Sequence, residues 1–278
     1  MNLLILLDTK PLLKWAGGKR QLLKAIEQYM PLHFDHYFEP FFGGGALYFH
    51  LYDMGLISGG TVGDTNRDLM DFYQILKTDC EKLLDEIHQL GYGNNREDFL
   101  HARKEYNEIR ETARKSALLV YLNRHCFNGL YRVNLKGEYN VPFGKYRTVN
   151  YPSDEAFRRV SESLKNCNLV TGDYRKICGG AKANDFVYFD PPYYPLSETA
   201  TFTEYATGGF DKINQEELAK VYRELDTKGV QLMESNSDCP FINDLYCDYN
   251  KIHLNTQTSI NSKATGRSAG RELIILNY

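Results

Sequence analysis

The sequence lacks the features that mark secreted, membrane-bound and metal-stapled proteins. Its six cysteines lie far apart and form no C-x-x-C pair, which disfavours both a disulfide framework and a zinc site. The opening run MNLLILLDTK has no basic residue before it and is closed by Asp8 and Lys10, so it is a poor signal peptide and too short to span a bilayer. We therefore expect a cytoplasmic protein with buried free thiols and with neither a metal nor a membrane partner.

The chain also lacks a strong charge of either sign. Its net charge of −3 gives no general attraction to nucleic acid, so any such binding must come from a local basic surface. The 278 residues are 42% hydrophobic and 25% charged, which is enough to bury a large core in one domain plus a subdomain. We expect a monomer or a weak dimer.

Short apolar runs, most of them ending at an acidic residue, recur in residues 33–73 and 165–278. The predicted strands are Tyr37–Phe38 before Glu39, Thr61–Val62 before Asp64, Leu169–Val170 before Asp173, Val187–Phe189 before Asp190, Val230–Met233 before Glu234, and Leu273–Leu276. Because helical stretches separate them, the pattern predicts a mainly parallel α/β sheet with functional groups at the carboxyl ends of its strands. The polar, basic residues 258–272 are predicted to form a mobile loop.

A different pattern fills residues 67–150. Apolar residues recur every three or four positions from Asp68 to Leu90 and from Glu97 to Arg124, which predicts two or three amphipathic helices. Two alternating runs then meet at Lys136-Gly137 and predict a β-hairpin within residues 127–146. We therefore expect a helical and hairpin subdomain, residues 67–150, inserted into an α/β domain made of residues 1–66 and 151–278.

A glycine turn follows the first predicted strand. In YFEPFFGGGALYFHL, glycines 43–45 lie between a strand and a helix, where the backbone can approach a ligand closely and the helix start offers free N–H groups. Asp64 ends the next strand, about where nucleoside-binding folds place a carboxylate for ribose hydroxyls. The spacing favours an adenosine-containing cofactor. Because the order is not G-x-G-x-x-G, a tight structural turn and a dinucleotide oxidoreductase remain alternatives.

The segment VYFDPPYYPLSE, residues 187–198, puts an acid, two prolines and two tyrosines directly after a strand. Asp190 and a carbonyl fixed by Pro191 and Pro192 can accept the two N–H bonds of an exocyclic amine on a nucleobase, which localises the nitrogen lone pair for attack. Tyr193 offers a ring that stacks on the base. An ionised Asp190 also suits a sulfonium methyl donor, whose positive charge disappears in the transfer. The alternative is a strand-ending turn with an N-cap acid.

Five segments occur in a fixed order across nearly the whole chain. They are KWAGGKRQLL (14–23), FEPFFGGGAL (38–47), GDTN (63–66), FNGLYRVN...NVPFGKY (127–146) and DPPYYPLSETATFTEY (190–205). Together they resemble the Dam family of DNA adenine-N6 methyltransferases. The resemblance implies a Rossmann-like class I S-adenosylmethionine-dependent methyltransferase sheet with an inserted DNA-recognition subdomain. It implies methyl transfer from S-adenosylmethionine to N6 of an extruded adenine in double-stranded DNA, in GATC, by a stand-alone enzyme or by one paired with a restriction endonuclease.

The resemblance also assigns catalytic and cofactor residues. The catalytic residues are Asp190, Pro191, Pro192 and Tyr193; the cofactor-binding residues are Trp15, Lys19, Phe41, Gly43, Gly45, Asp64, Asp173, Tyr174 and Asp190. Trp15 and Lys19 would close over the cofactor, and the backbone from Phe41 to Gly45 would cradle its methionine part. Asp64 would bind the ribose, and Asp173 with Tyr174 would contact the adenine. Without the family, Trp15 is equally well explained as a core anchor and Asp173 as a turn acid.

The segment expected to read DNA is the predicted hairpin. The residues assigned to DNA binding are Lys14, Phe127, Asn128, Leu130, Arg132, Pro142, Lys145 and Tyr146. Arg132 and Lys14 would each contact a guanine. Residues 127–130 would wedge into the duplex where the adenine has left, Pro142 and Tyr146 would meet the central pair and the outer guanine, and Lys145 a phosphate. Alternatively, the hairpin tip packs onto the helices. For Arg103, Lys104, Arg110, Arg114 and Lys115 a solvated helix face is favoured over a DNA footprint.

The sequence leaves three other functions as alternatives. One is a catalytically silent, sequence-specific DNA-binding protein, against which intact Asp64, Asp190 and Tyr193 argue. Another is an amino-methyltransferase for another site or base, although cytosine-N4 enzymes usually carry serine and glutamine or RNA methyltransferases carry asparagine where this chain has Asp190. An oxidoreductase would need a hydride-transfer site, and no such constellation is found among the scattered histidines.

Overall fold

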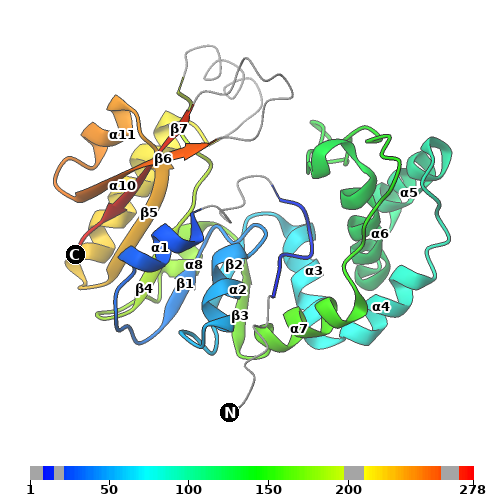
Figure 1. The fold of residues 1–278 in the computed structure, drawn as a ribbon, viewed down its shortest axis with the longest axis horizontal. Helices are drawn as coiled ribbons and strands as arrows, with labels where there is room; N and C mark the ends of the chain where they lie inside the picture. The colour runs from blue at the N-terminus through cyan, green and yellow to red at the C-terminus, as the bar shows by residue number, and fades with distance from the viewer. Residues whose placement is uncertain (1–8, 16–21, 197–209, 258–268) are drawn as a thin grey trace. The chain divides into compact units, whose positions relative to one another are not determined.

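The computed structural model of the chain describes residues 9–15, 22–196, 210–257 and 269–278 (Figure 1). The chain divides into two compact units, the first made of residues 1–20 and 42–172 and the second of residues 21–41 and 173–278. Each unit contains both helices and strands, as the α/β prediction requires. No helix in the described ranges is long and apolar enough to cross a membrane.

The first unit is mainly helical. Its elements are α2 (Ala46–Asp53), β2 (Gly60–Asp64), α3 (Arg67–Thr78), α4 (Cys80–His88), α5 (Arg96–Glu108), α6 (Thr112–His125), the 3-10 turn η1 (Phe127–Gly129), α7 (Asp154–Leu164) and β3 (Cys167–Thr171). Strands β2 and β3 are parallel, with Val62 opposite Leu169 and Asp64 opposite Thr171. Helix α6 packs against α3, α4 and α5 and buries most of its residues, so it forms the centre of the helical part.

Residues 67–125 form four helices where the sequence predicted two or three. The first predicted helix is divided at Asp79, which ends α3 and whose side chain accepts the Lys82 backbone N–H to begin α4. The second is divided before α6, where the Glu111 carboxylate accepts the N–H groups of Ala113 and Arg114. The acids that the periodicity treated as surface positions therefore act as caps.

Residues 126–144 fold back on themselves as a loosely paired hairpin. Two isolated antiparallel bridges join Cys126 to Phe143 and Val133 to Tyr139. The turn lies where the sequence placed it, because Gly137 has a φ of +77° and the Asn134 side-chain carbonyl accepts the N–H groups of residues 136 and 138 at 2.9 and 3.0 Å. Side chains thus satisfy backbone groups that a regular ladder would pair, and continuous strands do not form.

The second unit holds the larger group of strands. Its elements are α1 (Leu23–Tyr29), β1 (Tyr37–Glu39), α8 (Tyr174–Cys178), β4 (Phe186–Phe189), α10 (Lys212–Thr227), β5 (Gln231–Ser237), α11 (Pro240–Leu245), β6 (Asn250–Gln257) and β7 (Ala269–Leu276). The strands lie in the order β1-β4-β5-β7-β6. The first three are parallel, and β7 runs antiparallel to both of its neighbours. Apolar side chains of β4, β5 and β7 pack with those of α10 in one buried core.

Three predictions about this unit are corrected. Glu234 does not end its strand, because β5 continues through the polar residues Asn236 and Ser237 and Glu234 is fully buried inside it. Strand β6 was missed, since NKIHLNTQ is too polar to read as a strand and is held by pairing along its length with β7. Residues 269–272 of the predicted loop belong to β7, and 258–268 lie outside the described residues.

The six cysteines are free thiols, as predicted. Cys126, Cys167, Cys178 and Cys239 are buried, and burial raises the pKa of the Cys178 thiol to about 12. The prediction of burial is wrong for Cys247, which is exposed, and Cys80 is half-buried. Within the described residues no group of three or more histidine, cysteine or acidic side chains could hold a metal ion.

Candidate functional site

The glycine turn of the first unit is covered by an indole ring. Gly43 and Gly45 have φ values of +49° and +69°, a left-handed conformation that residues with a side chain rarely adopt. A Cβ atom on Gly43 would lie 2.8 Å from Cδ1 of Trp15. The loop therefore needs glycine both for its backbone shape and for the close approach of Trp15.

Asp64, at the end of β2, is attached to this loop. Its Oδ2 accepts the Gly43 N–H at 3.1 Å and its Oδ1 accepts the Asn66 N–H at 2.9 Å. Burial raises the pKa of the Asp64 carboxyl, and these two N–H groups lower it in part. The Tyr73 hydroxyl donates to the Gly43 carbonyl at 3.1 Å. The glycine turn and Asp64, which the sequence analysis paired by their spacing, are therefore in direct contact. This contact fixes the shape of the loop.

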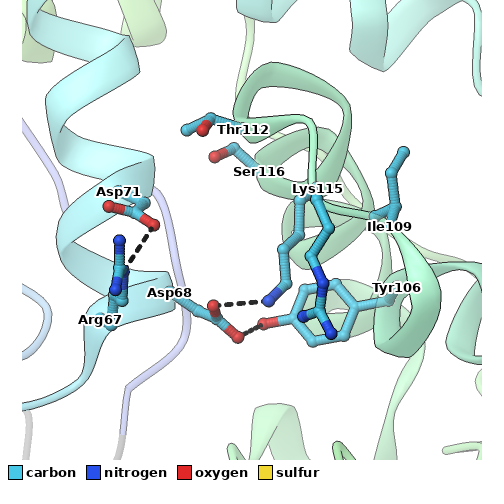
Figure 2. Close-up of a pocket in the computed structure, with 9 residues that line it drawn as sticks. Arg67, Asp68, Asp71, Tyr106, Ile109, Thr112, Lys115 and Ser116 are labelled. Atoms are coloured by element: carbon cyan, nitrogen blue, oxygen red, sulfur yellow. Dashed lines mark hydrogen bonds and ion pairs between the residues drawn. The ribbon is translucent and has the colours of Figure 1, made fainter.

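Trp15 is also linked to the hairpin, through contacts that the sequence did not predict. Its ring stacks on Tyr131, with centroids 5.5 Å apart and planes 28° apart. The Tyr131 hydroxyl donates to Asp68 of α3 at 3.2 Å. As Figure 2 shows, Asp68 also receives the Tyr106 hydroxyl at 2.5 Å and the Lys115 ammonium at 2.7 Å. We call these four residues, Asp68, Tyr106, Lys115 and Tyr131, the Asp68 cluster.

The charge of the Asp68 cluster is set by its lysine. Burial by itself would raise the pKa of the Asp68 carboxyl, but hydrogen bonds from Lys115 and Tyr106 and the Lys115 charge lower it overall. Lys115 is therefore partly committed to an ion pair, a role different from the solvated helix face predicted for it.

A pocket of about 330 Å³ lies beside the Asp68 cluster, between α3 and the facing ends of α5 and α6 (Figure 2). Its lining residues are Arg67, Asp68, Asp71, Tyr106, Ile109, Arg110, Thr112, Lys115 and Ser116. None of them was predicted as a site residue. Its cationic side chains are Arg67, Arg110 and Lys115, of which Arg67 pairs with Asp71 at 3.7 Å and Lys115 with Asp68 at 2.7 Å.

Several residues predicted to bind DNA lie together at the base of the hairpin. The Lys14 ammonium lies 5.0 Å from the centroid of the Tyr146 ring, whose hydroxyl accepts the Asn128 N–H at 2.8 Å. The buried Asn123 side chain, which the sequence did not single out, accepts the Lys14 N–H at 2.8 Å and donates to the Lys14 carbonyl at 2.7 Å and to the Gly129 carbonyl at 3.2 Å. Asn123 therefore attaches both Lys14 and Gly129 to α6.

The segment around η1, at the base of the hairpin, presents apolar side chains to solvent. Phe127 is 50% exposed and Leu130 is 39% exposed, whereas other parts of the hairpin pack onto α5, through the ring pairs Phe99–Phe143 and Tyr106–Tyr139. Pro142 and Lys145 are exposed as well. Arg132 is exposed, and its guanidinium is steadied by the Asn140 side-chain oxygen at 2.7 Å and the Asn140 carbonyl at 3.3 Å. The predicted DNA-binding residues of this segment are thus accessible.

In the second unit, Phe41 and Tyr174 belong to an aromatic group. Their rings are stacked 5.3 Å apart, and Phe41 meets the edge of Phe210 at 5.7 Å. Asp173 caps α8, and its carboxylate accepts the Arg175 N–H at 2.9 Å and the Arg175 guanidinium at 2.8 Å. Those bonds hold the pKa of Asp173 below its usual value. Asp173 thus has a capping role in the fold, and its contact with a cofactor adenine stays a prediction.

The predicted catalytic residues form a loop directly after β4. Asp190 is half-buried, Pro191 is buried, and the Tyr193 hydroxyl donates to Glu272 of β7 at 3.2 Å. The Pro192 carbonyl accepts the Gln215 amide of α10 at 2.9 Å. The loop is therefore tied to elements that begin 22 and 79 positions after Asp190, and sequence periodicity gives no sign of such ties.

Buried polar side chains of β5 continue this attachment. Asn236 Oδ1 accepts the Tyr194 N–H at 3.2 Å, and the Ser237 hydroxyl donates to the Tyr194 carbonyl at 2.6 Å. The sequence signalled this region only through Glu234, which it placed wrongly at a strand end. Lys19 and residues 197–205 of the fifth segment lie outside the described residues.

Comparison with known proteins places these features in a family. The family model described as D12 class N6 adenine-specific DNA methyltransferase matches residues 15–260. The type II methyltransferase M.MjaIII of Methanocaldococcus jannaschii is 38% identical, over 98% of this chain and 100% of its own length. The DNA adenine methylase of Serratia marcescens is 36% identical, over 95% of this chain and 97% of its own. The DNA N-6-adenine-methyltransferase of Escherichia phage P1 is 32% identical, over 95% of this chain and 35% of its own.

Proposed function

The chain belongs to the D12 class of N6 adenine-specific DNA methyltransferases, and from this premise we propose that it transfers the methyl group of S-adenosylmethionine to an adenine extruded from duplex DNA, in GATC. The observation that carries the proposal is the loop at Asp190. A carboxylate and two prolines follow a buried strand, and a side chain from α10 fixes the loop's backbone. Such a loop presents fixed acceptors to an amine.

The residues of the glycine turn fit the proposed cofactor. Gly43 and Gly45 hold the turn in a shape that leaves no room for a Cβ atom, and Trp15 offers an aromatic face against it. Asp64 would hold the ribose, and Phe41, Asp173 and Tyr174 are assigned to the cofactor by family resemblance alone. When bound, S-adenosylmethionine supplies an electrophilic methyl group on a positively charged sulfur.

Asp190 and its neighbours would act on the target amine. We assign to the Asp190 carboxylate and a proline carbonyl the two hydrogen bonds that draw the amine nitrogen toward tetrahedral geometry. The carboxylate also lies where positive charge develops on that nitrogen, and Tyr193 would face the flat base. Because these groups are held before substrate arrives, little reorganisation is needed at the moment of transfer.

The hairpin and helices of residues 67–150 would recognise the DNA. Exposed Phe127 and Leu130 suit insertion into the duplex, because unstacking a base costs a few kcal/mol that inserted apolar groups partly offset. Arg132 is assigned to a guanine edge, and Lys14 to a second guanine. Replacing Arg132 with alanine is expected to lower discrimination at one guanine by about 1–3 kcal/mol, measured from methylation rates on duplexes altered at each position.

The function is tested by incubating the purified protein with labelled S-adenosylmethionine and duplexes that contain GATC or a permuted sequence. Label on the GATC duplex only, at a position that a methylation-sensitive nuclease identifies as the adenine, is expected. Asp190→Ala should abolish transfer while DNA affinity changes less than about twofold, and the exposed Asp248→Ala serves as a control with unchanged transfer. DNA that binds without gaining label would instead support the silent DNA-binding alternative.

A further inference from the structure

We propose that Gln215 of α10 is a positioning residue for methyl transfer, because it ends a buried chain of hydrogen bonds that fixes the backbone of the loop at residues 190–194. The chain runs from Tyr246 through Glu234 and Asn236 to Gln215, and we call it the Gln215 network. It reaches the loop at the Pro192 carbonyl. The inference rests on the catalytic role proposed above for that loop.

Backbone groups that cannot reverse set the direction of the bonds from Asn236 through Gln215 to the loop. Asn236 Oδ1 accepts two backbone N–H groups, those of Tyr194 at 3.2 Å and Ser237 at 2.8 Å. The amide nitrogen of Asn236 must then point the other way, where it donates to Gln215 Oε1 at 3.0 Å. Gln215 in turn can offer only its own amide nitrogen to the Pro192 carbonyl, at 2.9 Å. The Pro192 carbonyl therefore faces the amide nitrogen of Gln215, which donates, and never its oxygen.

The far end of the network is anchored on Glu234 in β5. Its carboxyl oxygens accept the Asn236 amide at 2.9 Å and the Tyr246 hydroxyl of the segment after α11 at 2.6 Å. Gln215, Glu234, Asn236 and Tyr246 are all 0% exposed. Burial raises the pKa of the Glu234 carboxyl to about 7.

A purely structural role explains the Gln215 network poorly. Burying an amide or a carboxyl costs free energy even when it is hydrogen-bonded, and apolar residues of the same size would fill the space between α10 and β5 at lower cost. The network instead ends on the loop by two contacts, at the Pro192 carbonyl and at the Tyr194 N–H, and the neighbouring Ser237 hydroxyl donates to the Tyr194 carbonyl. Since a satisfied buried network is rigid, it holds the residues on either side of Tyr193 in one position.

The test measures the rate constant of a single turnover, with enzyme in excess over a GATC duplex and S-adenosylmethionine saturating. When folded enzyme saturates the duplex, this rate constant does not depend on how much of the enzyme is folded, whereas the burst amplitude measured with the duplex in excess does. Gln215→Leu removes the donor and keeps a side chain of similar size. We expect the rate constant to fall roughly 10- to 100-fold, as a small misplacement of reacting groups does, with DNA and cofactor affinities changed less than about twofold.

Two further variants give readouts that a structural role would not change. Gln215→Glu can still accept from Asn236, but it offers Pro192 a proton only when its carboxyl is protonated, so its rate relative to the unaltered enzyme should rise as the pH falls. Tyr246→Phe removes one hydroxyl from the far end of the network and should slow transfer by a smaller factor. The matched control is Tyr222→Phe, which removes an equally buried hydroxyl that bonds the Leu232 carbonyl instead.

Three outcomes would overturn the inference. A Gln215→Leu enzyme with an unchanged rate constant and only a lower amplitude would show a structural role. Equal slowing by Tyr246→Phe and Tyr222→Phe would show that loss of any buried hydroxyl slows transfer and that the bonds through Glu234 have no special role. If the unaltered enzyme transfers no methyl group, the proposed function fails and this inference with it; if Asp190→Ala abolishes transfer while Gln215→Leu leaves the rate constant unchanged, the inference alone fails.

Discussion

Two carboxyl groups of this protein, Asp68 and Glu234, each accept a tyrosine hydroxyl, yet their pKa values move in opposite directions. Asp68 meets the Lys115 ammonium at 2.7 Å beside a pocket of about 330 Å³, and its pKa is lowered. Glu234 lies inside a sheet with only neutral donors, and burial raises its pKa to about 7. A hydrogen bond from a tyrosine therefore does not decide the charge of a carboxyl; a nearby cation or full burial does.

The two groups consequently serve different purposes. The Asp68 cluster joins α3, α5, α6 and the hairpin through charged groups that remain partly open to water, so it will respond to salt. The Gln215 network is sealed from water and holds a backbone in place, so it will respond to the loss of any member. Altering each carboxyl separately tests this distinction.

The largest effect is expected from Glu234→Ala. It leaves one amide hydrogen of Asn236 and the Tyr246 hydroxyl buried without an acceptor and opens a cavity, so the free energy of unfolding should fall by about 3–5 kcal/mol. Urea unfolding followed by circular dichroism measures it, with the exposed Asp248→Ala as control. A loss below about 1 kcal/mol would mean that water or neighbouring side chains replace the lost acceptor.

The second prediction is that the free energy of unfolding depends on pH differently for Glu234 and for Asp68. The pKa of Glu234 in the folded protein, about 7, exceeds the ordinary value of 4.5, so the folded state holds its proton more tightly and stability should fall as the pH rises from about 5 to 8. Relative to a Glu234→Gln variant, which does not titrate, the unaltered protein should lose roughly 2–3 kcal/mol over this range. A flat difference would contradict the raised pKa.

For Asp68 the pH dependence of the free energy of unfolding has the opposite sign and falls in a lower pH range. Its folded pKa is lowered, so the stability it contributes is present above the ordinary value of 3.8 and is lost as the pH falls through the lowered value. Between pH 5 and 8 Asp68 should therefore contribute no slope. Measurements on Asp68→Asn and the unaltered protein over that range should give parallel curves.

The smallest effect is expected from Asp68→Asn at neutral pH. The variant loses a partly exposed ion pair with Lys115 but keeps an acceptor for Tyr106, so the free energy of unfolding should fall by about 1 kcal/mol. This difference should shrink in 1 M salt, whereas the effect of Glu234→Ala should not. If the loss of unfolding free energy in Asp68→Asn does not depend on salt, Asp68 stabilises the fold as a fully buried group does, like Glu234.

The sequence could predict those parts of the fold and site that leave a local pattern. Acids after apolar runs located the ends of β1, β2 and β4, and a glycine turn with Asp64 at the right spacing anticipated a contact of 3.1 Å. The hairpin turn at Lys136-Gly137 was confirmed because Gly137 takes a positive φ. Each of these signals comes from neighbouring residues.

The parts that could not be predicted arise where distant segments meet. Trp15 stacks on Tyr131 and Gln215 bonds Pro192 across long stretches of chain, and neither member of either pair shows its partner in its own surroundings. Glu234 was placed at a strand end because polar residues follow it, yet buried amides in β5 satisfy one another and let the strand continue. Side-chain networks of this kind become visible only once the fold is known.

The position of Trp15 provides a built-in optical reporter. It is the single tryptophan of the chain, so all indole fluorescence of the protein comes from one ring that covers the glycine turn and stacks on Tyr131. A ligand entering beneath that ring, or a shift of the hairpin, will change the wavelength or intensity of the emission. Stopped-flow mixing can therefore follow both events in real time without any dye.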